Sequence, residues 1–162
     1  MRAAIITISS SKAGGEGEGE DKSGACLVNF ALRLGAAISG RDLIPDDQTR
    51  IEECLRCWAD EECCDLVLTT GGTGFAPSDV TPEATRSVLE REAPGLAEAM
   101  RAASREHTPH WMLSRGAAGI RGKTLIVNFP GSPRSVEQAG EAIADALPHA
   151  IALLAERPTE HR

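Results

Sequence analysis

Apolar residues follow two different spacings along the chain. Short runs rich in aliphatic and β-branched residues favour buried strands, whereas longer segments with apolar residues every three or four positions favour helices that bury one face. The short runs predict strands over residues 3–9, 37–44, 66–70 and 124–129. The longer segments predict helices over residues 25–34, 48–63, 82–90, 94–105 and 133–154.

This alternation of strands and helices is typical of a three-layer α/β/α fold with a mostly parallel, Rossmann-like sheet. Residues 111–122 are less periodic, and two short apolar stretches within them indicate a small antiparallel excursion. Thr81 is expected to cap the helix that starts at Pro82, and Pro148 is expected to break the last helix. We expect a single domain over residues 1–162.

Charge and hydropathy argue against two classes of partner. A formal net charge of −7 disfavours nucleic-acid binding, which requires a dense array of lysine and arginine. No apolar stretch approaches the roughly 18 residues of a membrane span, and the run at residues 3–8 is too short for a signal peptide.

The five cysteines are an odd number, so we expect reduced, mostly buried thiols in a cytoplasmic protein.

Four loops follow the expected strands, at residues 9–19, 45–47, 71–79 and 130–133. Parallel strands end at the same edge of a sheet, and α/β proteins bind their ligands at that edge. We therefore expect these loops to lie together and to hold the chemistry of the protein.

The loop after the third strand has the composition of an anion site. Gly71, Gly72 and Gly74 allow positive φ and let backbone N–H groups face a ligand, and the following helix adds the positive end of its dipole. For the glycines alone, a tight strand-to-helix turn without a ligand is the simpler interpretation.

Carboxylates beside this turn favour a ligand. Asp79 ends the glycine loop, and Asp46 and Asp47 follow the preceding strand, so two loops can bring carboxylates to one edge. Such groups suit Mg²⁺, which usually binds one or two carboxylates together with substrate phosphates. The pair Asp46 and Asp47 can equally form a turn and a helix cap, and both interpretations remain open.

Three further features carry less weight. The acidic segment 14–21 does not satisfy the P-loop pattern, and we interpret it as a mobile flap. No GxGxxG motif follows the first strand, which disfavours a dinucleotide site. Phe75 is expected to pack under its own loop, and covering a planar ligand is the less favoured alternative.

Four segments together resemble one protein family: IPDDQ at 44–48, LTTGGTGFAPSDVTPEA at 68–84, PGLAEAMR at 94–101 and LSRGAAGIRGKTLIVNFPGSP at 113–133. With them the chain resembles, over nearly its whole length, the MogA type of molybdenum cofactor biosynthesis protein and the corresponding domain of gephyrin. The resemblance implies molybdopterin adenylyltransferase activity, in which Mg²⁺ and ATP adenylylate the terminal phosphate of molybdopterin and pyrophosphate is released.

The resemblance also implies roles for individual residues. Asp46 and Asp79 match two functional aspartates of the family, near the reacting phosphates and in the nucleotide and metal region. The implied nucleotide- and substrate-binding positions are Ser9, Gly71, Gly72, Thr73, Gly74, Ser114, Pro130, Gly131 and Ser132. Ser10 departs from the pattern, because many relatives have aspartate there. A homotrimer and a molybdenum insertase partner are implied as well.

Two other functions compete with the transferase. One is a non-catalytic molybdopterin-binding carrier or scaffold of the same family, because a fold does not by itself imply an activity. The other is an ordinary nucleotide-binding or hydrolytic Rossmann-like protein. The missing phosphate fingerprints disfavour the second, and the presence of Asp46 and Asp79 favours the enzyme over both.

Overall fold

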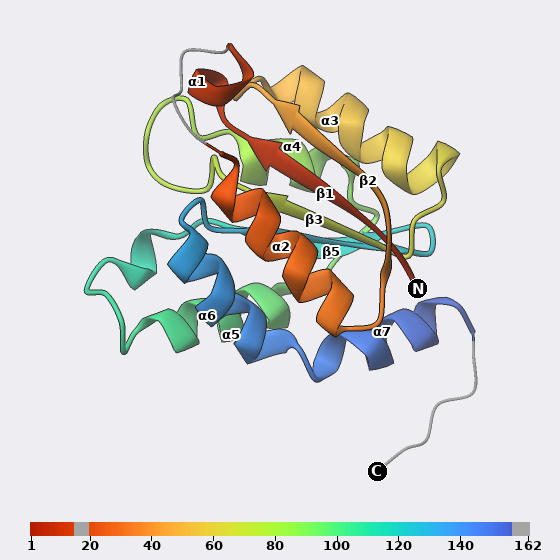
Figure 1. Ribbon diagram of the computed structural model, residues 1–162. Helices are drawn as coiled ribbons and strands as arrows, with labels where there is room; N and C mark the ends of the chain where they lie inside the picture. Colours follow the sequence, from red (N-terminus) through yellow and green to blue (C-terminus); the bar gives the residue numbers. More distant parts are fainter. Residues whose placement is uncertain (15–19, 157–162) are drawn as a thin grey trace.

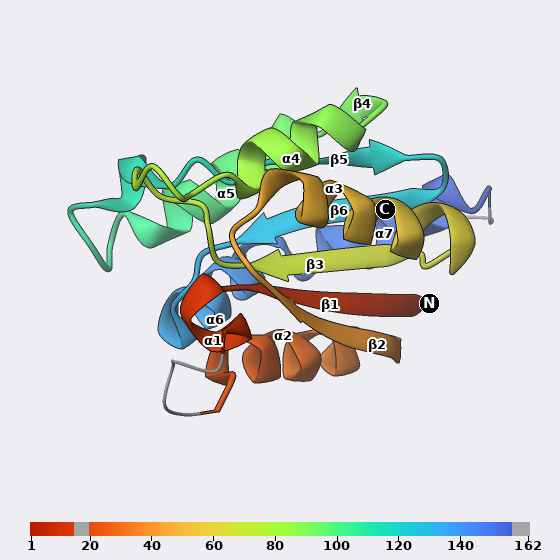
Figure 2. The ribbon, with the colours of Figure 1, turned by 90° about the horizontal axis from the view of Figure 1, so that it is seen from above.

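In a computed structural model that describes residues 1–14 and 20–156, the described residues form a six-stranded sheet. The strand order across the sheet is β2 (Ala37–Ile44), β1 (Arg2–Ile8), β3 (Leu66–Thr70), β6 (Thr124–Phe129), β5 (Ala118–Arg121) and β4 (Arg91–Glu92). The first four strands are parallel to one another, and β5 and β4 pair antiparallel. Figure 2 shows β3 and β6 side by side and pointing the same way. The predicted α/β fold with a mostly parallel sheet is confirmed.

Helices cover both faces of the sheet (Figure 1). One face is covered by α2 (Lys22–Arg33), α5 (Pro94–Ser104), α6 (Pro133–Ile143) and α7 (Ala146–Leu154). The other face is covered by α3 (Gln48–Arg56) and α4 (Thr81–Val88). Alternate residues of β1 divide between the two cores: Ile5 packs with the first group of helices and Ile6 with the second. This division is what a strand buried on both faces produces.

Three short helical turns complete the described fold. They are α1 (Ser10–Ala13) after β1, a π-helical turn η1 (Cys57–Glu61) that extends α3, and a 3₁₀ turn η2 (Trp111–Leu113) after α5. In the antiparallel excursion expected over 111–122, the second half is strand β5, while the first half is η2 rather than a strand. The two-residue strand β4 was not expected. Among the described residues, no helix is long and apolar enough to cross a membrane.

Two expected helix boundaries are wrong. The last helix breaks at Ala144–Asp145 and not at Pro148, which lies in the first turn of α7. A proline ring clashes with the carbonyl four residues before it, so Pro148 ends the preceding helix near Ala144 and is tolerated at the start of the next one. Thr81 is the first helical residue of α4 rather than its cap; the cap position is Val80, which makes no side-chain hydrogen bond.

Helix α2 starts at Lys22, earlier than the expected residue 25, because Asp21 caps it. The carboxylate of Asp21 accepts a hydrogen bond from the backbone N–H of Gly24 (2.9 Å). The expected flap at 14–21 includes residues 15–19, which lie outside the described part of the chain. Phe75 does not pack under its own loop, since its side chain is 66% exposed.

Candidate active site

The parallel strands bring the four expected loops to one edge of the sheet. The backbone N–H of Ser9, after β1, donates to the carbonyl of Ile44 at the end of β2 (2.9 Å). The hydroxyl of Thr70 at the end of β3 donates to the carbonyl of Pro130 after β6 (2.7 Å). These bonds join neighbouring strand ends in pairs, so the glycine loop lies between the loops that carry Asp46 and Pro130.

The backbone of the glycine turn is oriented by its carbonyl groups. Thr81 donates to two of them: its hydroxyl to the carbonyl of Gly71 (2.9 Å) and its backbone N–H to the carbonyl of Gly72 (3.1 Å). Arg115 donates to the other two: its backbone N–H to the carbonyl of Thr73 (2.9 Å) and its Nε to the carbonyl of Gly74 (2.7 Å). Four successive carbonyls therefore point into the protein.

The N–H groups of the turn differ from its carbonyls: only that of Gly71 has an acceptor in the described part of the chain, the carbonyl of Phe129 (3.3 Å). Within residues 1–14 and 20–156, the amides of Gly72, Thr73 and Gly74 donate to no described acceptor. Successive unpaired N–H groups in a loop that leads into a helix form a concavity suited to an anion. The turn thus has the donors of a phosphate site.

Glycine is required at the first two positions of the turn. Gly71 has φ +100° and Gly72 has φ +62°, values that L-residues rarely adopt. A Cβ atom on Gly71 would lie 2.2 Å from the carbonyl oxygen of Ile8, and one on Gly72 would lie 2.3 Å from Thr81 Oγ1. A Cβ on Gly131 would lie 3.4 Å from the Cα of Gly71, so the loop after β6 also packs against the turn.

Asp46 lies beside the glycine turn. Its Oδ2 accepts hydrogen bonds from the backbone N–H (2.8 Å) and the hydroxyl (2.9 Å) of Ser10. Its Oδ1 lies 3.1 Å from the position that a Cβ on Gly72 would occupy. Asp47, in contrast, caps α3 by accepting from the N–H of Arg50 (2.8 Å). The cap interpretation therefore applies to Asp47 alone, and Asp46 stands at the site edge.

Asp79 lies at the far end of the same loop. Its Oδ2 accepts from the N–H of Ala76 (2.9 Å) and lies 2.8 Å from the position of a Cβ on Gly74. The turn is thus flanked by one carboxylate near Gly72 and another near Gly74. Both aspartates are half-buried, so their carboxylates remain open to solvent and to a ligand.

The donor set fits magnesium only together with a ligand. Among the described residues, no group of three or more histidine, cysteine, aspartate or glutamate side chains could hold a metal ion. Two carboxylates flank the turn, and Mg²⁺ is commonly bound through one or two carboxylates plus substrate phosphates. Asp46 and Asp79 are the residues that would hold it.

Ser114 belongs to a separate pocket beyond the loop at 130–132. This cavity of about 120 Å³ lies between α5, η2 and α6 and is lined in part by Arg101, Trp111, Ser114, Asn128 and Pro130. Because Pro130 lines the cavity and Gly131 packs on Gly71, the loop separates the two compartments and contacts both.

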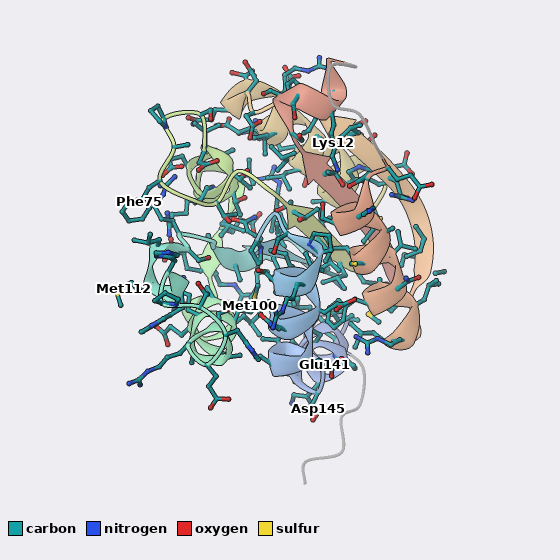
Figure 3. All side chains as sticks on the ribbon, turned by 60° about the vertical axis from the view of Figure 1, so that its left-hand side comes forward. Lys12, Phe75, Met100, Met112, Glu141 and Asp145 are labelled. Carbon is teal, nitrogen blue, oxygen red and sulfur yellow. The ribbon has the colours of Figure 1, made fainter. Side chains whose placement is uncertain are left out.

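The remaining predicted site residues have structural partners of their own. Ser9 caps α1, with its hydroxyl 3.5 Å from the N–H of Lys12. Ser132 caps α6 by accepting from the N–H of Ser135 (3.2 Å). These contacts explain the serines locally and neither add nor remove a ligand role. In Figure 3, Phe75 and Met112 project on the same side of the molecule, and both side chains are exposed.

Two acidic groups near the site have lowered pKa values. Burial would raise the pKa of Asp21, but hydrogen bonds from Thr7 and Gly24 and the charges of Lys12 and Arg41 lower it overall. The hydrogen bond from Arg115 is the main cause that lowers the pKa of Glu83 in α4. Both carboxyl groups are therefore ionised at neutral pH and keep their contacts.

Residue-level prediction from the sequence missed two members of the site. Thr81 was expected to cap a helix, yet its buried hydroxyl holds the carbonyl of Gly71. Arg115 was not singled out, although it follows Ser114 and contacts both ends of the glycine loop. An arginine next to a predicted substrate-side serine was the available signal.

Together these features define an α/β protein with a ligand site at the carboxyl edge of its parallel strands. The family model described as "Probable molybdopterin binding domain" matches residues 4–149. The chain therefore belongs to this family.

Individual relatives agree with the family assignment. The chain is 40% identical over 152 residues to a molybdopterin adenylyltransferase of Helicobacter pylori, covering 93% of this chain and 86% of the relative. It is 47% identical over 115 residues, or 71% of its length, to the molybdenum cofactor synthesis protein cinnamon of Drosophila melanogaster, but spans only 19% of that protein. The crystal structure of the molybdopterin biosynthesis enzyme MoaB from Thermus thermophilus superposes with a TM-score of 0.90 at 44% identity, covering 98% of this chain and 99% of that one.

Proposed function

We propose that this protein is a molybdopterin adenylyltransferase, a nucleotidyltransferase of molybdenum cofactor biosynthesis that uses Mg²⁺ and ATP. The bacterial relative named molybdopterin adenylyltransferase, with 40% identity across 93% of this chain, supports the activity. One structural observation carries the proposal: the turn from Gly71 to Gly74 points its carbonyls inward and leaves three N–H groups free of described partners, between two carboxylates.

The proposed reaction is the transfer of an adenylyl group from one anion, ATP, to another, molybdopterin. An oxygen of the terminal phosphate of molybdopterin forms a bond to the α-phosphorus of ATP, and the bond from that phosphorus to the pyrophosphate group breaks. No covalent enzyme nucleophile takes part. Positioning of the two phosphates and stabilisation of their charge are therefore the contributions that the protein has to make.

The residues of the site fit these two tasks. The N–H groups of Gly72, Thr73 and Gly74 would donate to the nucleotide phosphates, and the start of α4 adds a positive dipole end. Asp46 and Asp79 would hold Mg²⁺, which when bound offsets phosphate charge and orients the triphosphate. Ser9 completes the proposed nucleotide side.

Molybdopterin is proposed to occupy the second compartment. The pocket that Ser114 lines opens beside Pro130, and the loop from Pro130 to Ser132 separates it from the glycine turn. A substrate whose ring system lies in this pocket could extend its phosphate past that loop towards the α-phosphate. We further propose that the chain forms one domain over residues 1–162, assembles as a homotrimer, works in the cytoplasm and delivers its product to a molybdenum insertase.

The experiment that tests the activity is an adenylylation assay. Purified protein is mixed with molybdopterin and Mg-ATP, and pyrophosphate is measured for the wild type, Asp46→Asn and Asp79→Asn. We expect molybdopterin-dependent release from the wild type and its loss in both variants. Both variants should keep the melting temperature of the wild type, because each change is nearly isosteric and lies at a loop edge. Asp47→Asn, which alters only the cap of α3, is the matched control for turnover.

The same assay tests the alternative function. A wild type that binds molybdopterin tightly and releases no pyrophosphate would be a carrier or scaffold, and the proposed transferase activity would be refuted. Normal turnover per folded molecule in Asp79→Asn would refute only the proposed role of the Asp79 carboxylate, and not the activity itself.

A further inference from the structure

Arg115 connects the wall of the substrate pocket to both ends of the glycine loop. Its backbone N–H donates to the carbonyl of Thr73 (2.9 Å) and its Nε to that of Gly74 (2.7 Å). Its Nη2 donates to the carbonyl of Asp79 (2.6 Å), and its guanidinium pairs with the carboxylate of Glu83 in α4. Each of the three guanidinium nitrogens therefore has a protein acceptor.

The charge of this arginine is balanced within the protein. The side chains of Arg115 and Glu83 are 31% and 42% exposed, and the hydrogen bond from Arg115 lowers the pKa of Glu83. A guanidinium already bonded to two carbonyls and a carboxylate is arranged to hold a loop rather than to bind a substrate phosphate. Its planar fork reaches acceptors on both ends of the loop, which the single ammonium of a lysine cannot do.

The contacts of Arg115 lie at both ends of the segment that carries the carboxylate of Asp79. The carbonyls of Gly74 and Asp79 are held by one guanidinium, and the segment between them closes through Ala76, whose N–H donates to Asp79 Oδ2. A change in the separation of the two carbonyls would therefore move the carboxylate relative to the N–H groups of the turn.

We propose that Arg115 is a positioning residue that shapes the loop from Gly74 to Asp79 and so places the Asp79 carboxylate for catalysis. The catalytic part of this inference rests on the proposed adenylyltransferase function. Arg115 also lies between Ser114 and Gly116, which both line the substrate pocket, and Arg101 donates to the carbonyl of Gly116 (3.2 Å). The same residue thus joins the two compartments of the site.

The test compares Arg115→Gln, Arg115→Lys and Glu83→Gln with Arg121→Gln as a matched control. Arg121 likewise pairs with the carboxylate of Asp60 and donates to the carbonyl of Val88 (3.0 Å). The side chain of Arg121 is 23% exposed and that of Asp60 is 45% exposed, so the ion pair is similar to that of Arg115 and Glu83. These contacts are remote from the glycine loop in the fold, so the control removes a similar ion pair without altering the site.

Two readouts are measured on each folded variant. Hydrogen exchange followed by mass spectrometry reports the order of the 70–80 segment, and steady-state assays give kcat and the KM for Mg-ATP. For Arg115→Gln we expect faster exchange in this segment and a fall in kcat of about tenfold to a hundredfold, with a smaller change in KM. Arg115→Lys should recover only part of the loss, Glu83→Gln should cause a milder one, and Arg121→Gln should match the wild type in both readouts.

Equal exchange in Arg115→Gln and Arg121→Gln would overturn the inference, as would full recovery of kcat by lysine. The exchange measurement needs no turnover, so it decides the loop-shaping step separately from the adenylylation assay. If Arg115→Gln does not fold, Arg115→Lys and Glu83→Gln still decide the matter, because wild-type behaviour of both would overturn the inference. A wild type without pyrophosphate release would refute the proposed function and the catalytic part of the inference together.

Discussion

Gly71→Ala is the substitution whose effect the structure determines most directly. Gly71 has φ +100°, and an added Cβ would lie 2.2 Å from the carbonyl oxygen of Ile8, a backbone atom of β1 that cannot rotate away. Gly35 provides a matched control. It also has a positive φ, +78°, but an added Cβ there would meet nothing within 4 Å.

The difference between the two variants isolates the steric contact. An L-residue at left-handed φ costs roughly 1–2 kcal/mol, and this penalty applies at both positions. Forcing an extra carbon into a packed site adds about 1–3 kcal/mol, and this cost applies only at Gly71. We therefore expect losses of about 1–2 kcal/mol for Gly35→Ala and about 2–5 kcal/mol for Gly71→Ala. For a domain of this size the gap corresponds to roughly 2–12 °C in Tm.

Urea unfolding followed by circular dichroism gives the free energy of unfolding of each variant. The m-values should equal that of the wild type, because neither change alters the surface exposed on unfolding. Equal losses for the two variants would refute the reasoning, since they would mean that the strand end yields to the added carbon at no cost. A larger loss for Gly35→Ala would refute it as well.

Two further outcomes follow from side-chain contacts near the site. Ser10→Ala removes two hydroxyl bonds, one donated to Asp46 Oδ2 and one accepted from the Asp46 N–H, and keeps the bond from the Ser10 N–H to Oδ2. A hydrogen bond to a charged group is worth about 1.5–3 kcal/mol. If this energy holds the Asp46 carboxylate in place, kcat/KM for pyrophosphate release should fall about tenfold or more, and an unchanged value would contradict the role of Ser10. Because the folded-state pKa of Asp21 is lowered from its ordinary value of 3.8, its stabilisation is present above that value and is lost as the pH falls through the lower folded-state pKa. The stability difference between wild type and Asp21→Asn, measured by urea unfolding, should therefore shrink below about pH 4, and a constant difference would contradict the assigned contacts.

The location of the candidate site at one edge of the sheet follows from the sequence pattern, because the pattern determines the sheet. Buried apolar runs separated by helices imply parallel strands, and parallel strands place their following loops at one edge. The glycines follow β3 directly, Asp79 ends the same loop, and Asp46 follows β2. No side-chain detail was needed for this step.

The partners within the site could not be predicted in the same way. Asp46 and Asp47 are adjacent in sequence and chemically identical, yet one contacts Ser10 and lies beside Gly72 while the other caps α3. Which carboxylate faces the site depends on the backbone angles at the end of β2, and composition carries no information about them. Arg115 reaches acceptors 32 to 42 residues away in sequence, so its role depends on the tertiary fold.

The hydrogen bonds of its backbone carbonyls explain why this turn suits the binding of a phosphate. An isolated glycine-rich loop has no reason to direct its N–H groups to one side, because its carbonyls and amides are equally available to water. In this protein Thr81 and Arg115 hold the four carbonyls from Gly71 to Gly74 on the protein side. The donors are thereby oriented before a ligand arrives, and stabilisation of a phosphate then requires no reorganisation of the loop. It follows that Thr81 and Arg115, which supply no group to the substrate in the proposed reaction, determine the shape of the site as much as the glycines do.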